Sequence, residues 1–140
     1  MRHWLWILLG TILIAACTFA IYHVSQARAQ RKREDSYQAA LLSYSAVLRS
    51  GMSREAVETY LREKNVEFRQ MCCVDTKLSK GIYDDLVRVG QERAPWFCSE
   101  NNVYIAFQFA GSRPAHKGWD ARPSDTLAAI TVFHWLEGCL

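Results

Sequence analysis

The chain has 140 residues, which is enough for one domain once an N-terminal targeting segment is set aside. Its formal net charge of +3 is unevenly distributed. Residues 1–33 contain five basic residues and no acidic one, a charge of +5, whereas residues 34–140 contain the other 12 basic and all 14 acidic residues, a charge of −2. A nucleic-acid-binding domain needs a basic face on the domain itself, so the distribution argues against that class of function.

Residues 4–24 contain no Asp, Glu, Lys or Arg. As a helix with a rise of about 1.5 Å per residue they extend roughly 31 Å, the thickness of a bilayer's hydrocarbon core. Trp4 and Trp6 at one end and Tyr22 at the other favour the headgroup layers. The sequence therefore predicts a transmembrane anchor over residues 4–24, a basic juxtamembrane flank over residues 25–35 and a domain over residues 36–140.

Two other fates of the apolar segment stay open. Residues 27–29 (ARA) supply a signal-peptidase pattern, and residues 14–17 (IAAC) resemble the lipobox that precedes lipidation at Cys17. The apolar run is longer than the roughly 7–15 residues of a signal peptide, and it continues after Cys17. We therefore favour an uncleaved single-pass anchor, or uncleaved signal, in a bacterial inner membrane.

Two amphipathic helices are expected after the flank. Apolar residues recur at spacings of four, three and four from Tyr37 to Leu48, and Gly51 is expected to end this helix. Ser53 is placed to cap a second helix that stops near Asn65. The buried side of this pair is expected to contain Tyr37, Leu41, Tyr44, Leu48, Ala56, Val57, Tyr60 and Leu61.

After these helices the apolar pattern alternates with a period of two, which predicts strands. Their ranges are Val66–Cys73, Ile82–Val89, Val103–Phe109 and Leu127–Leu136, with a long loop over residues 110–125. The expected fold is α+β, in which an N-terminal transmembrane helix precedes two helices packed on one face of a three- to four-stranded antiparallel sheet.

The last two strands can form a hairpin that separates two faces. The register that places Val103 opposite His134 also places Phe107 opposite Ile130 and Phe109 opposite Ala128. This face is apolar and suits packing against the helices. The other face carries aromatic and polar residues, namely Tyr104, Gln108, Thr131, Phe133 and Trp135.

Four cysteines lie outside the anchor: Cys72, Cys73, Cys98 and Cys139. An even number in a small domain suggests two disulfides in an oxidising compartment. The hairpin register places Cys98 opposite Cys139, and pairing these two would leave Cys72 and Cys73 as a vicinal bridge or as thiols. Alternatively, all four gather at one end of the sheet; we favour this arrangement and leave the connectivity open.

Two further states of the cysteines stay open. One is four free thiols in a cytoplasmic domain, as the positive-inside rule implies for the basic flank. The other is a zinc site that includes His116 or His134, although adjacent cysteines lack the usual spacer between zinc ligands. The expectation is that no metal is bound and that the domain is extracytoplasmic.

Signatures of catalysis and of cofactor binding are missing from the sequence, including the nucleophile elbow, the phosphate loop and the zinc-protease motif. Asp84 and Asp85 are neighbours on a predicted strand and are expected to be solvated edge charges. We therefore expect that the chain is not an enzyme, that it needs no cofactor and that it has no small-molecule substrate.

Residues 48–61 (LRSGMSREAVETYL) resemble the G-M-T/S-x-x-x-V-x-x-x-L signature of the SmpA/OmlA family, whose fold resembles β-lactamase inhibitor proteins. The resemblance implies two helices on an antiparallel sheet, an envelope location and partner binding without catalysis. The tail formed by residues 96–99 (WFCS) and 136–140 (LEGCL) also resembles uncharacterised bacterial single-pass membrane proteins.

The expected function is binding of another envelope protein by a membrane-anchored module. Its candidate contact residues are Tyr104, Trp119, Phe133 and Trp135, because interfaces favour amphipathic aromatic side chains. One alternative is a pseudopilin-like structural subunit, since an apolar helix precedes an amphipathic helix and a cysteine-bearing sheet. Another is a cytoplasm-facing thiol or redox protein that uses Cys72 and Cys73.

Overall fold

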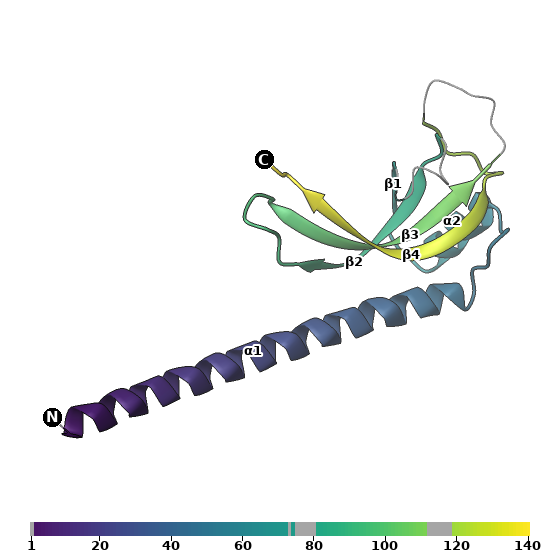
Figure 1. Cartoon of the computed structure of the whole chain (residues 1–140). Helices are drawn as coiled ribbons and strands as arrows, with labels where there is room; N and C mark the ends of the chain where they lie inside the picture. Colours follow the sequence, from purple (N-terminus) through teal and green to yellow (C-terminus); the bar gives the residue numbers. More distant parts are fainter. Residues whose placement is uncertain (1, 73, 75–80, 112–118) are drawn as a thin grey trace. The chain divides into compact units, whose positions relative to one another are not determined.

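The computed structural model describes residues 2–72, 74, 81–111 and 119–140, with N-terminal side chains described at Trp4 and from Gly10 onward. The chain divides into two compact units, Met1–Ser36 and Tyr37–Leu140. Helices α1 and α2 are followed by strands β1, β2, β3 and β4 (Figure 1). The fold class is α+β, as the sequence predicts.

Helix α1 (Arg2–Ser45) contains the predicted anchor. Over its described residues it is long and apolar enough to cross a membrane, and the apolar part is not buried by the rest of the chain. The hydroxyl of Thr18 donates to the carbonyls of Ile14 and Ala15, at 3.1 and 2.9 Å. This polar side chain is thus satisfied within the helix, as a lipid environment requires.

The second unit begins with the last turns of α1, whose predicted stripe faces the core. Tyr37 is buried, and Leu41 and Tyr44 pack against the apolar core. The helix ends at Ser45, so the prediction that Gly51 ends it is wrong. The amides of Val47 and Leu48 both donate to the Tyr44 carbonyl, and this tight turn carries Leu48 into the core.

Helix α2 (Arg54–Glu63) has the predicted N-cap, because the Ser53 hydroxyl accepts the Ala56 amide at 3.3 Å. Asn65 stops it with φ of 54°, and the next amide, of Val66, donates to the Leu61 carbonyl at 2.9 Å. The prediction that Ala56 is buried is wrong. Arg54 is buried instead, three residues before Val57 and on the same side of the helix.

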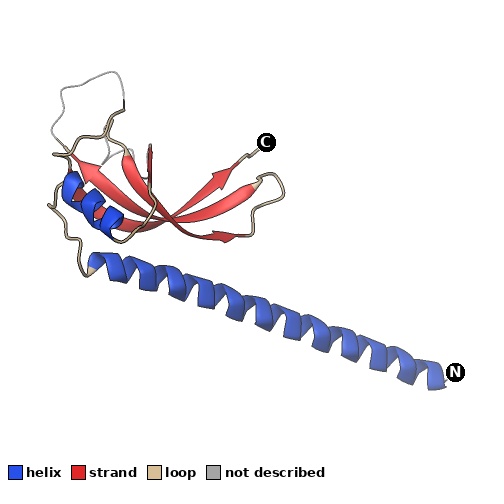
Figure 2. Ribbon diagram, turned by 180° about the vertical axis from the view of Figure 1, so that it is seen from behind, coloured by secondary structure: helices blue, strands red, loops and turns tan. Residues whose placement is uncertain are grey.

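The sheet contains β1 (Arg69–Met71), β2 (Asp84–Glu92), β3 (Glu100–Ala110) and β4 (Thr126–Glu137) in this spatial order, and all neighbours are antiparallel. Figure 2 shows the long central strands crossing with the twist typical of such sheets. Strand β1 has three residues, far fewer than the predicted Val66–Cys73; Cys73 lies outside the described residues.

The core lies between the helices and one face of the sheet. Val57 and Leu61 of α2 belong to the same buried cluster as Ile105 and Phe107 of β3. The ring of Tyr44 lies edge-on to that of Phe107, with centroids 5.4 Å apart. Two helices therefore pack on one face of a four-stranded sheet.

The β3–β4 register confirms most of the predicted hairpin. Val103 lies opposite His134, and Phe107 lies opposite Ile130. The predicted pairing of Phe109 with Ala128 is wrong, because a bulge between Gln108 and Phe109 shifts the partner to Leu127. A bulge adds one residue to one strand, which a count of alternating residues does not reveal.

Gly90 makes room for the end of α1. It lies where the β2–β3 register shifts, and a Cβ at this position would be 2.7 Å from the ring of Tyr37.

We expect Gly90→Ala to lower the free energy of unfolding by about 1–3 kcal/mol, because the buried ring must shift. Urea unfolding of the full chain in detergent measures the change. Gly10→Ala is the control, since a Cβ there contacts nothing; equal stability of both variants would contradict the packing of Tyr37 against Gly90.

Candidate functional site

The face of the sheet that points away from the helices carries a second apolar cluster, which we call the open face. Side chains alternate between the faces along a strand, so these residues are interleaved with those of the core. The rings of Phe133 and Trp135 meet edge to face, with centroids 5.6 Å apart. The buried members are Leu86, Tyr104 and Ala106, and the half-buried ones are Met71, Val74, Phe133 and Trp135.

A groove of about 520 Å³ opens on this face, and we call it the arginine groove. Arg69 lies opposite Leu86, and Arg88 lies opposite Tyr104. Cross-strand partners share a face, so both arginines flank an apolar floor. The complete lining consists of Val66, Glu67, Phe68, Arg69, Leu86, Arg88 and Tyr104.

The two arginines of the groove influence the pKa of Tyr104. Burial, and then the nearby carboxylate of Glu137, raise the pKa of Tyr104 above its ordinary value of 10.0, whereas Arg69 and Arg88 oppose the shift. The hydroxyl donates to Oε1 of Glu137 at 3.4 Å. Tyr104 is therefore held as a neutral phenol beneath two exposed cations, and the groove can accept a ligand that carries negative charge and apolar groups.

The four predicted contact residues do not form one surface. Tyr104 is only 3% exposed and forms the floor of the groove, while Phe133 and Trp135 lie beside it on the open face. Trp119 lies elsewhere: its ring is 6.2 Å from that of Tyr83, next to a bridge between Asp120 and Ile82. That bridge is where β2 begins, whereas Trp135 pairs with Asn102 near the start of β3, at the other end of the sheet.

The cysteines are also divided. Cys98 and Cys139 form a disulfide, as the hairpin register suggested, and neither sulfur is free to bind zinc. Cys72 is disulfide-bonded, and it follows β1 at the opposite end of the sheet. The favoured arrangement, in which all four cysteines gather at one end, is therefore wrong for Cys72. Cys73 lies outside the described residues, and Cys17 of α1 is a free, exposed thiol.

The expectation that Asp84 and Asp85 are solvated edge charges is wrong, because both are completely buried. Strand β2 lies inside the sheet between β1 and β3, which explains the burial. The carboxylate of Asp84 accepts the amides of Val74 and Phe109, at 3.0 and 3.3 Å. It therefore ties the segment after β1 to the end of β3.

Asp85 faces the helices and contacts Arg54, whose burial was not predicted from the sequence. Nη1 of Arg54 lies 2.5 Å from Oδ1 of Asp85, and its Nε lies 3.5 Å from Oδ2 of Asp125. Nη2 donates to the Tyr83 carbonyl, and the guanidinium lies 3.8 Å from the centre of the Phe109 ring. We call these five residues the Arg54 cluster, which joins the first turn of α2 to the sheet.

Burial dominates the electrostatics of the Arg54 cluster. It raises the pKa of Asp85 from 3.8 to about 7, an effect that Arg54 opposes and that Glu58 and Asp84 reinforce. Within the described part of the chain, Oδ2 of Asp85 has no hydrogen-bond partner. The carboxylate is enclosed by protein, so we assign the cluster to stability rather than to ligand binding.

Comparison of the chain with protein-family models, with curated proteins and with solved structures found no match.

Proposed function

We propose that the chain is a membrane-anchored, non-catalytic module that binds another protein of the bacterial envelope. The observation that carries the proposal is the arginine groove, with two exposed cations over a buried apolar floor. The proposed ligand is a segment of the partner that carries both acidic and apolar side chains.

The groove combines features that protein interfaces favour. Arginine and aromatic residues are enriched at interfaces, and Arg69 and Arg88 line the groove together with Phe68 and Tyr104. Phe133 and Trp135 extend the open face beyond the groove. The domain as a whole is acidic, with a charge of −2 over residues 34–140, so this basic site is local and can select an acidic partner by charge complementarity.

The proposed location is the inner membrane, with the domain outside the cytoplasm. Disulfides persist in oxidising compartments, and both Cys72 and the Cys98–Cys139 pair are disulfide-bonded. The basic flank over residues 25–35 favours the opposite orientation, but the disulfides outweigh it in our proposal. Envelope binding is also what the resemblance of residues 48–61 to the SmpA/OmlA family implies.

Site-specific photo-crosslinking in intact bacteria tests the groove. A benzophenone amino acid in place of Glu67, an exposed residue of the groove, is expected to give a discrete adduct. Reversing Arg69 and Arg88 to Glu should reduce that adduct at least tenfold, which corresponds to about 1.4 kcal/mol of binding energy.

Two controls define the result. The same crosslinker in place of Thr59, exposed on α2, should give no adduct, and Arg49→Glu should leave the Glu67 adduct unchanged. A groove adduct that survives the double charge reversal, or one that appears equally at Thr59, would contradict recognition by the two arginines.

A further inference from the structure

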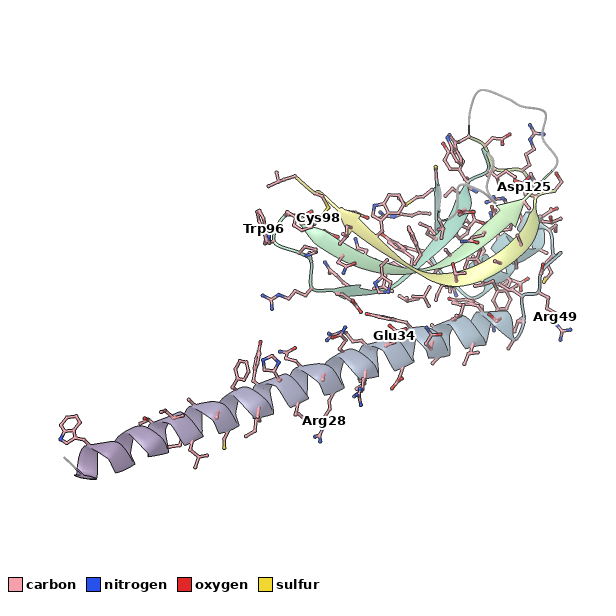
Figure 3. All side chains as sticks on the ribbon, in the orientation of Figure 1. Arg28, Glu34, Arg49, Trp96, Cys98 and Asp125 are labelled. Atoms are coloured by element: carbon pink, nitrogen blue, oxygen red, sulfur yellow. A yellow bond between two sulfur atoms is a disulfide. The ribbon has the colours of Figure 1, made fainter. Side chains whose placement is uncertain are left out.

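An exposed apolar surface lies at the end of the sheet where β2 joins β3 and where the chain leaves β4. Trp96 is 91% exposed, and its ring lies edge-on to that of Phe97, with centroids 5.8 Å apart. Figure 3 shows Trp96 beside Cys98 at this end of the sheet. We call the surface the apolar tip; its members are Trp96, Phe97, Leu136 and Leu140, each at least 40% exposed.

The apolar tip is held in place by covalent and hydrogen bonds. The Cys98–Cys139 disulfide joins its two strands, and the Leu140 amide donates to the Phe97 carbonyl at 2.9 Å. Ser99 adds two bonds to the Glu137 carbonyl, from its amide at 3.0 Å and its hydroxyl at 2.9 Å. The exposed rings therefore belong to an ordered turn rather than to a fraying end of the chain.

The chemistry of the tip suits the interface between lipid headgroups and acyl chains. Tryptophan favours this layer because its ring is apolar and its N–H remains hydrated. Burial of Phe and Leu side chains there removes apolar surface from water and is therefore favourable in free energy. Two acidic residues near the tip bind within the domain: Glu100 accepts a hydrogen bond from Asn102, and Glu137 accepts one from Tyr104. None of the four side chains that define the tip is charged, so the tip offers apolar contact area whose insertion does not depend on anionic lipids.

The anchor keeps a bilayer within reach of the tip. Residues 25–36 lie within α1, between the proposed span and the second unit, and 12 helical residues extend about 18 Å. A domain of about 100 residues has a radius of gyration of only about 13 Å. The helical spacer is thus no longer than the domain is wide, so the domain stays close to the membrane that holds the chain, and an exposed apolar patch on such a domain marks an interaction site.

We propose that the apolar tip inserts into the interfacial layer of the membrane in which the chain is anchored. This second contact would restrict the orientation of the domain relative to the membrane and leave the arginine groove accessible to a partner. The inference depends on membrane anchoring and is independent of what the groove binds.

Quenching by brominated lipids tests the insertion directly. The full chain is reconstituted into phosphatidylcholine vesicles as a variant that retains only Trp96, with Trp4, Trp6, Trp119 and Trp135 replaced by Phe. We expect its fluorescence to be quenched by bromine on the acyl chain, and more by bromine near the carboxyl end than near the methyl end, because interfacial side chains lie shallow. Quenching should persist at high salt, since the four side chains of the tip carry no charge.

Two matched variants complete the experiment. A chain that retains only Trp4 measures quenching in the anchor, and a chain that retains only Trp119 measures quenching at the opposite end of the sheet. Quenching of Trp4 and Trp96 but not of Trp119, with the Cys98–Cys139 bond intact by mass spectrometry, would support insertion. The proposal would be overturned if Trp96 and Trp119 were quenched equally. It would also be overturned if Trp96 were not quenched because a protein surface covers it, or if Trp4 in the anchor were not quenched.

Discussion

Replacement of Arg54 by Met is expected to lower the free energy of unfolding by about 3–5 kcal/mol, because it leaves two buried carboxylates without their cation. The side chain is 2% exposed and contacts Asp85 at 2.5 Å and Asp125 at 3.5 Å. Urea unfolding of the reconstituted chain, followed by circular dichroism, measures the loss. Arg62→Met on the same helix is the control; its partner is Glu58 and its side chain is 61% exposed, so the cost should stay below about 1 kcal/mol.

The pH dependence separates the charge of Arg54 from its packing. Burial raises the pKa of Asp85 to about 7, so the folded state binds a proton that the unfolded state releases above its ordinary value of 3.8. The corresponding stability is complete below pH 3.8 and is lost as the pH rises through about 7. Without Arg54 the charged carboxylate is less favourable still, so the variant's deficit should be large at pH 7 and smaller near pH 4. A deficit that does not change with pH would assign the role of Arg54 to packing against Phe109.

Removal of the Cys98–Cys139 disulfide by serine substitution at both positions is expected to cost about 4 kcal/mol of unfolding free energy. The two cysteines are 41 residues apart, and the bond restricts the unfolded chain over the whole β3–β4 hairpin. Denaturant unfolding of the double variant measures the cost, with Cys17→Ser as the control because that thiol is free and exposed. A double variant as stable as the control would show that the hairpin closes without its disulfide.

Local patterns predicted much of this fold. The cap at Ser53 and the stop at Asn65 follow from hydrogen bonds within a few residues, and both are present. The two-residue period placed Phe107 and Phe109 on the core face, and a simple register brought Cys98 opposite Cys139. These features depend on neighbours in sequence or on one hairpin, which is why they could be inferred.

The features that were missed depend on tertiary packing. The burial of Asp84 and Asp85 could not be predicted without knowing that β1 pairs with the outer side of β2. The contact between Asp85 and Arg54 joins residues 31 positions apart, so it too depends on the tertiary fold. Arg54 does occupy an apolar-stripe position three residues before Val57, and this signal could have identified it as buried. The arginine groove combines residues of β1, β2 and β3, so no single stretch of sequence reveals it.

Thiol labelling of intact bacteria tests most directly whether this is an envelope module with oxidised cysteines. A Cys17→Ser chain removes the free thiol of α1, and a bulky, membrane-impermeant maleimide is then added with or without prior reduction. We expect a gel shift only after reduction, because Cys72, Cys98 and Cys139 are disulfide-bonded and we propose that the domain lies outside the cytoplasm. Labelling that needs cell lysis but no reductant would contradict both the proposed orientation and the disulfides, and it would place a thiol-bearing domain in the cytoplasm.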